Sequence, residues 1–163
     1  MGVEVGMDTN ARKNRTGDAM EDLVESYLIN SGLIKSKTYF KEMYISEIEK
    51  KFKLDLSSIS NDGRAEKRFD YVFVNKNGVV FACECNFYGS NGSKLNSTAG
   101  RYKLLTLESK DIKNFHFVWF TDGIGWNSAK RHLRETFEVL DNLYNLNDLD
   151  NGIIDKLLSF KNN

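Results

Sequence analysis

Two β-rich runs joined by a tight-turn signal are the feature that most constrains how this chain folds. The runs are RFDYVFV and VVFACECNF, and the residues NKNG lie between them. The last two, Asn77 and Gly78, form an Asn-Gly pair, which is the strongest short-range signal for a hairpin because both residues tolerate positive φ. The sequence therefore predicts an antiparallel hairpin over residues 68–87.

Helical periodicity on both sides of this hairpin sets the fold class. A helix is predicted from Asp18, a candidate N-cap, to a stop at Gly32, because apolar residues recur in it at helical spacing. These residues are Met20, Leu23, Val24, Tyr27 and Leu28. The remaining expected elements are a short helix over residues 44–52, helices over 94–108, 128–140 and 152–160, and a buried strand over 114–120. This order indicates an α+β fold.

Composition narrows the function classes. The 163 residues suit one domain, and a formal net charge of zero means that a nucleic-acid partner would have to be met by a local basic patch. No run approaches the roughly 20 apolar residues of a membrane helix, and no secretory signal is visible, so no membrane partner is expected. Cys83 and Cys85 lie two apart on one strand, which predicts buried free thiols in a reducing, cytoplasmic compartment.

The hairpin carries two carboxylates where a hydrophobic strand would be expected. Folding it about Asn77 makes Asp70 and Glu84 cross-strand neighbours, and alternation puts Arg68, Asp70 and Val72 on one face. Like charges opposite each other on a sheet repel, and burial increases the cost. Mg²⁺ bound by the two carboxylates would resolve this and leave positions open for a phosphodiester. The alternative is that each carboxylate pairs with a lysine or arginine from elsewhere in the chain.

Four segments, in this order, extend the pattern beyond the two carboxylates. They are GVEVGMDTNARKNRTGDAME, NDGRAEKRFDYVF, ECNFYGSNGSKLNSTAGRYK and TDGIGW. Together they resemble the DpnII/MboI family of type II restriction endonucleases, within the PD-(D/E)XK nuclease superfamily. The resemblance implies a restriction-endonuclease-like core with a mixed central sheet and flanking helices. It implies that residues 1–163 form a single nuclease domain, corresponding to the C-terminal catalytic portion of longer proteins.

The resemblance also assigns the active centre. It implies that Asp70, Glu84 and the backbone carbonyl of Cys85 bind Mg²⁺. Asn86 stands where the superfamily has its catalytic lysine, and because asparagine carries no charge, Lys94 is the expected substitute. The alternative for Lys94 is a solvated lysine at a helix start.

The first helix supplies a further candidate. Glu21 falls where related nucleases have a glutamate near the metal, but Asp18 and Glu21 also have the spacing of a capping box, which would make Glu21 structural. Glu25, one turn later, is the fallback for the metal-site role.

Arginine and asparagine can hydrogen-bond guanine and adenine edges, and lysine suits phosphates, so a basic loop is expected to contact DNA. Its residues are Arg12, Lys13, Asn14 and Arg15, and the alternative is a solvated loop. Arg64, Lys67 and Arg68 are expected near the DNA backbone. Lys130, Arg131 and Arg134 are expected to meet phosphates or solvent.

The implied function is Mg²⁺-dependent hydrolysis of double-stranded DNA at unmethylated GATC by a homodimer, since a two-fold dimer suits a palindromic site. Ser97 and Arg101 depart from the family pattern within STAGRYK. Two alternatives stay open: a DNA-binding or assembly module without activity, and a repair or junction nuclease on the same core.

Overall fold

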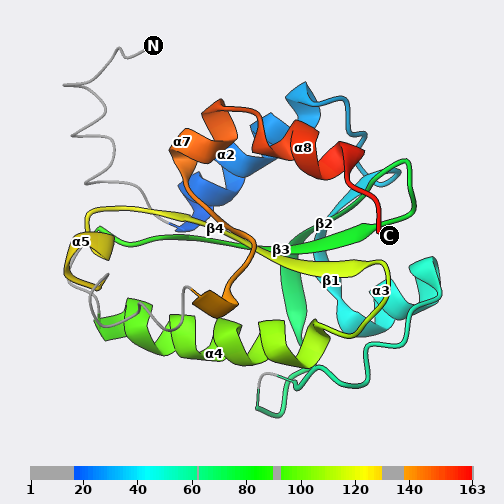
Figure 1. Cartoon of the computed structure of the whole chain (residues 1–163), viewed down its shortest axis with the longest axis horizontal. Helices are drawn as coiled ribbons and strands as arrows, with labels where there is room; N and C mark the ends of the chain where they lie inside the picture. Colours follow the sequence, from blue (N-terminus) through cyan, green and yellow to red (C-terminus); the bar gives the residue numbers. More distant parts are fainter. Residues whose placement is uncertain (1–16, 62, 90–92, 130–137, 163) are drawn as a thin grey trace.

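A mixed β-sheet forms the centre of the computed structural model, which describes residues 17–61, 63–89, 93–129 and 138–162. The strand order is β1-β2-β3-β4-β5. The pairs β1–β2 and β2–β3 are antiparallel, and β3–β4 and β4–β5 are parallel. Figure 1 shows α2, α7 and α8 on one side of the sheet and α4 on the other. The α+β class with a mixed sheet and flanking helices is therefore confirmed.

The strands are β1 (Tyr39–Tyr44), β2 (Arg68–Val74), β3 (Val80–Phe87), β4 (Phe115–Asp122) and β5 (Leu143–Tyr144). The helices are α2 (Gly17–Asn30), α3 (Ile45–Phe52), α4 (Ser93–Ser109), α5 (Trp126–Ala129), α7 (Leu146–Asp150) and α8 (Ile153–Ser159). The β2–β3 hairpin, helix α4 and the buried strand β4 all lie where the sequence predicted them.

The β2–β3 turn has the conformation that its asparagine and glycine favour. Gly78 has a φ of 77°, and its N–H donates to the carbonyl of Asn75 at 3.0 Å. The side-chain oxygen of Asn75 accepts the N–H groups of Asn77 and Val79, which holds both arms of the turn. Local chemistry therefore sets the register of the two strands that carry the carboxylates.

Helix α2 ends as predicted, through a glycine in the left-handed region. Gly32 has a φ of 94°, and the N–H of Leu33 donates back to the carbonyl of Leu28 at 3.2 Å. The N–H of Gly32 donates to Ile29, which completes a Schellman motif. The buried face of α2 consists of Met20, Val24 and Leu28.

Two apolar cores cover the two faces of the sheet. One packs α2, α7 and α8 onto one face and includes Tyr71, Phe73, Cys83 and Cys85. The other packs α3 and α4 onto the opposite face and includes Val72, Ala82, Tyr102 and Trp119. Both cysteines are buried and free, as predicted. No helix among the described residues is long and apolar enough to cross a bilayer.

The alternation predicted for β2 is wrong at its start. Phe69, rather than Arg68, packs with Val72 in the core on the α4 side, whereas Tyr71 lies in the other core. The neighbouring strand β1, which the sequence did not predict, is also irregular: Glu42, opposite this point, has a φ of 56°. The alternation therefore breaks between Phe69 and Tyr71, at Asp70.

Some predictions fall outside the described residues. Most of the expected 128–140 helix does, as do the basic residues of its face. So does the segment 1–16, with the expected DNA contacts Arg12, Lys13, Asn14 and Arg15.

Candidate active centre

Asp70 and Glu84 meet at the open end of the hairpin, away from its turn. The strand pairs Tyr71–Cys83 and Val72–Ala82 have the predicted register, which puts Asp70 opposite Glu84 when it is extended by one residue. A hydrogen bond and charge repulsion from Asp70 both act on the Glu84 carboxyl group. The cross-strand neighbours expected from the sequence are therefore in contact.

The backbone of Cys85 lies against Asp70. Its N–H donates to Oδ2 of Asp70 at 2.8 Å. Because the N–H and C=O of one residue in an extended strand point to the same side, the Cys85 carbonyl also points toward this edge of β3. Two carboxylates and one backbone oxygen therefore converge here, which is the kind of oxygen donor set that Mg²⁺ prefers.

Glu84 is buried, with 6% of its surface exposed. Burial and the Asp70 charge raise its pKa from 4.5 to about 8, although the neighbouring Lys67 acts in the opposite direction. The Lys67 ammonium group donates to Oε1 of Glu84 in a buried ion pair. The alternative that one of the carboxylates pairs with a lysine is therefore confirmed for Glu84.

Lys67 is the site residue whose role sequence reasoning missed. It was expected near the DNA backbone with Arg64 and Arg68, and the latter two are indeed exposed. Lys67 instead is 6% exposed and its ammonium group reaches Glu84. The signal available in the sequence was indirect: two carboxylates that face each other across a buried pair of strands need a nearby cation.

Glu21 lies close to the same centre. Burial raises its pKa from 4.5 to about 7, with further contributions from a hydrogen bond to Asp70 and from the Asp70 charge. Asp18 lies inside the first turn of α2 rather than at an N-cap position, so the predicted capping box is wrong. Asp70 therefore interacts with two other carboxyl groups at the open end of the hairpin, those of Glu21 and Glu84.

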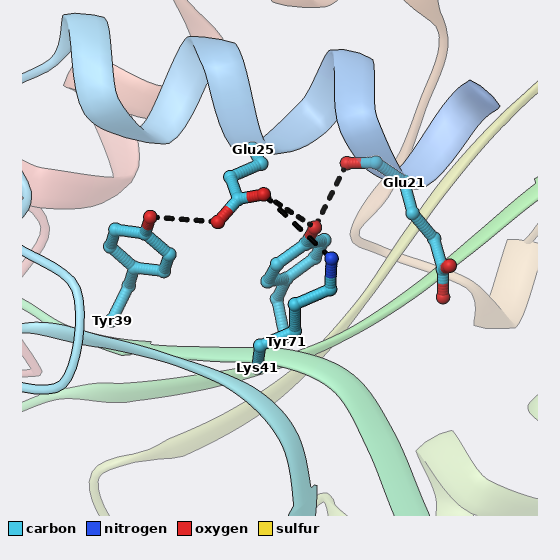
Figure 2. A network of polar contacts seen from close by, with 5 residues as sticks. All are labelled: Glu21, Glu25, Tyr39, Lys41 and Tyr71. Carbon is cyan, nitrogen blue, oxygen red and sulfur yellow. Dashed lines mark hydrogen bonds and ion pairs between the residues drawn. The ribbon is translucent and has the colours of Figure 1, made fainter. Parts of the chain in front are cut away.

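Glu25 belongs to a separate network, shown in Figure 2. It accepts a hydrogen bond from the Tyr39 hydroxyl at 2.8 Å and one from Tyr71 at 3.5 Å. Lys41 lies 3.8 Å from it. The Tyr71 hydroxyl also donates to the backbone carbonyl of Glu21, whose side chain points away from these partners in Figure 2. The Glu25 carboxylate thus bonds hydroxyl and cationic groups, whereas the Glu21 carboxyl group interacts chiefly with Asp70, and Lys41 acts on it only to lower its pKa.

The two other proposed catalytic side chains have different surroundings. The Asn86 side-chain oxygen accepts a hydrogen bond of 2.6 Å from the indole of Trp119, on the strand paired with β3. Lys94 lies in the first turn of α4 and is exposed, and its backbone carbonyl accepts a hydrogen bond from the Ser97 hydroxyl. Asn86 is therefore held in place, whereas Lys94 projects from the surface.

The donor set fits a divalent cation only if backbone oxygen contributes. Among the described residues, no three His, Cys, Asp or Glu side chains form a group that could hold a metal ion by themselves. The fit instead rests on Asp70, Glu84 and the Cys85 carbonyl, in a centre where burial and the Asp70 charge raise the pKa of Glu84.

Comparison with known proteins supplies a context for this centre. A family profile described as "DpnII restriction endonuclease" matches residues 1–156. The type II restriction enzyme DpnII of Streptococcus pneumoniae is 55% identical over 96% of this chain and 54% of its own length. MjaIII of Methanocaldococcus jannaschii is 39% identical over 97% of the chain and 54% of its own length.

A third relative, MboI of Moraxella bovis, is 37% identical over 97% of the chain and 51% of its own length. All three are named type II restriction enzymes. The chain spans about half the length of these curated relatives. No solved structure matches it.

Proposed function

Since the chain belongs to the DpnII restriction endonuclease family, we propose that it hydrolyses phosphodiester bonds of double-stranded DNA at unmethylated GATC with Mg²⁺. The observation that carries the proposal is the contact between Asp70 and Glu84 beside the Cys85 backbone. Burial and the Asp70 charge raise the pKa of Glu84 although Lys67 contacts it, and perturbed pKa values cluster at functional sites.

The proposed roles follow from the chemistry of each group. Asp70, Glu84 and the Cys85 carbonyl would hold the ion. When bound, Mg²⁺ would polarise a phosphate oxygen and lower the pKa of a water molecule. Glu21, beside Asp70, has a pKa of about 7 and would accept a proton near neutral pH.

Two further groups complete the proposed centre. Asn86, held by Trp119, would orient a phosphate or water by hydrogen bonding. Lys94 would place positive charge near the reacting phosphate, as the family resemblance implies.

DNA contacts form the second part of the proposal. The basic loop residues Arg12, Lys13, Asn14 and Arg15 would read the site, and the exposed Arg68 would contact backbone phosphate. A palindromic site pairs naturally with a two-fold dimer, so we propose a homodimer on DNA.

The test is incubation of the chain with Mg²⁺ and three matched duplexes. One contains GATC, one contains GATC methylated at adenine, and one lacks the site. Cutting confined to the first supports the proposal. Equal cutting of all three would favour a repair or junction nuclease. Metal binding without any cutting would favour a DNA-binding module without activity.

A further inference from the structure

Lys67 is a charged side chain in a place where charges are rarely tolerated. Its ammonium group lies 5.0 Å from the ring centre of Phe69 and 5.8 Å from that of Tyr102. The side chains of Lys67 and Glu84 each keep 8% of their surface exposed. A lysine is buried this deeply only when a carboxylate compensates its charge, so the position of Lys67 depends on Glu84.

Two positively charged groups, the Lys67 ammonium group and a divalent cation, would therefore compete for the Glu84 carboxylate. One of its oxygens already accepts the Lys67 ammonium group, while Asp70 contacts the same carboxyl group. A divalent ion bound by Asp70 and Glu84 would bring two positive groups onto one carboxylate in a poorly solvated place. Repulsion between like charges is strong there, so binding of the divalent ion would displace the Lys67 ammonium group from Glu84.

A neighbouring hollow gives the ammonium group somewhere to move. It has a volume of about 400 Å³, and its polar lining consists of Lys67, Ser60, Asn61, Arg101, Tyr102 and Glu108. Its oxygen acceptors include the amide of Asn61 and the carboxylate of Glu108, which already accepts a hydrogen bond from the Ser60 hydroxyl and can accept another from an ammonium ion. Lys67 thus lines both the carboxylate centre and an adjacent polar hollow.

We propose that Lys67 is the positioning lysine of this centre: its ammonium group holds the place of a divalent cation on Glu84 and moves into the hollow when that cation binds. This inference rests on the proposed cation site at Asp70 and Glu84. It gives a residue three positions before Asp70 a role distinct from the one proposed for the exposed Lys94.

Magnetic resonance on the DNA-free protein tests this without measuring activity. The Lys67 ammonium signal, identified by its loss in Lys67→Arg, is expected to be visible because the group is buried and hydrogen-bonded. The Cys85 amide, which donates to Asp70, reports cation binding independently. We expect added Mg²⁺ to shift both signals with one midpoint, in the native protein and in Lys94→Arg.

The outcomes separate the two claims. A shift of the Cys85 amide with an unchanged Lys67 signal would leave the cation site standing and overturn the role of Lys67. If saturating Mg²⁺ moved neither signal, the cation site would be wrong and this inference would fall with it.

A second variant uses the competition itself. In Lys67→Met the apolar stem remains and the competing charge is absent. At a pH high enough to ionise Glu84 in both proteins, Mn²⁺ should bind Lys67→Met roughly threefold or more tightly, because two cations in a low dielectric repel. A folded Lys67→Met that binds Mn²⁺ more weakly would show that Lys67 only supports the site, contrary to the proposal. Circular dichroism establishes folding, and Lys67→Arg should keep the native affinity.

Discussion

The two ends of the β2–β3 hairpin differ in how their polar and charged side chains are satisfied. At the turn end, the buried Asn75 uses its full hydrogen-bonding capacity. Its amide donates to the carbonyls of Leu157 and Phe160, and its oxygen accepts two backbone N–H groups. At the open end, Asp70 and Glu84 share a centre with the buried ammonium group of Lys67.

The turn end therefore contributes to the stability of the fold, whereas the open end carries the candidate active centre. The turn end ties the hairpin to α8 and the chain after it, and its polar groups satisfy one another. The open end retains carboxylates whose pKa values are raised, so it stores electrostatic repulsion that a bound cation would relieve. Substitutions at the two ends should therefore act on different quantities.

The largest expected effect is the loss of cutting in Asp70→Asn. If Asp70 holds the cation as proposed, its removal forfeits several kcal/mol of transition-state stabilisation, so we expect DNA cutting to fall by about 10³-fold or more. Asparagine can still accept the Cys85 N–H, so folding should survive. Single-turnover cleavage of a GATC duplex measures the first quantity and urea unfolding the second.

The same variant should make the metal-free protein more stable at alkaline pH, because the Asp70 charge raises the pKa of both Glu21 and Glu84. Unfolding of Asp70→Asn at lower urea than the native chain at that pH would contradict the view that this end stores repulsion.

At the turn end, Asn75→Ala should leave the charge centre intact and reduce stability. The buried carbonyl of Leu157, the carbonyl of Phe160 and two backbone N–H groups lose a partner, so the free energy of unfolding should fall by about 2 to 4 kcal/mol. Chemical denaturation measures this. Asn77→Ala is the matched control: Asn77 is exposed and donates one side-chain bond to Phe160, so its loss should cost about 1 kcal/mol or less. Equal effects of the two substitutions would refute the assigned role of Asn75.

The raised pKa of Glu84 at the open end of the hairpin should make the stability of the protein depend on pH. A carboxyl group whose pKa is higher in the folded protein binds more protons in that state, so stability falls as pH rises through the window between the two values. For Glu84 this window runs from about 4.5 to about 8. We expect the free energy of unfolding without metal to fall by about 1.4 kcal/mol or more across it.

Urea titrations at successive pH values check this prediction, and Glu84→Gln should flatten the curve. A stability that rises over the same window in the native chain would mean that the Lys67 pair outweighs burial and Asp70.

The smallest effects contrast two glutamates one turn apart on α2. Glu25→Gln weakens the ion pair with Lys41 and the bond from Tyr39, so stability should fall slightly. Glu21→Gln removes a charge beside Asp70, so stability without metal should rise slightly above neutral pH. Thermal unfolding compares the two variants, and shifts of the same sign would remove the distinction between the two networks.

Much of the fold could be predicted from local sequence. The Asn75–Gly78 turn, the Gly32 helix end and the buried face of α4 each follow from residue chemistry within a few positions. Strand β1 could not, because Tyr39 packs in one core and Met43 in the other, so no simple alternation is visible. The candidate carboxylates were found because they break an apolar pattern.

The sequence by itself determined the hairpin, its register and hence the opposition of Asp70 and Glu84, because turn geometry and strand periodicity are local properties. Only the tertiary structure decided which groups surround that pair. The break in alternation at Asp70, the approach of Glu21 from α2 and the burial of Lys67 against Glu84 depend on how distant segments pack. Charge compensation in a core is a property of three-dimensional neighbours, and spacing along the chain does not encode it.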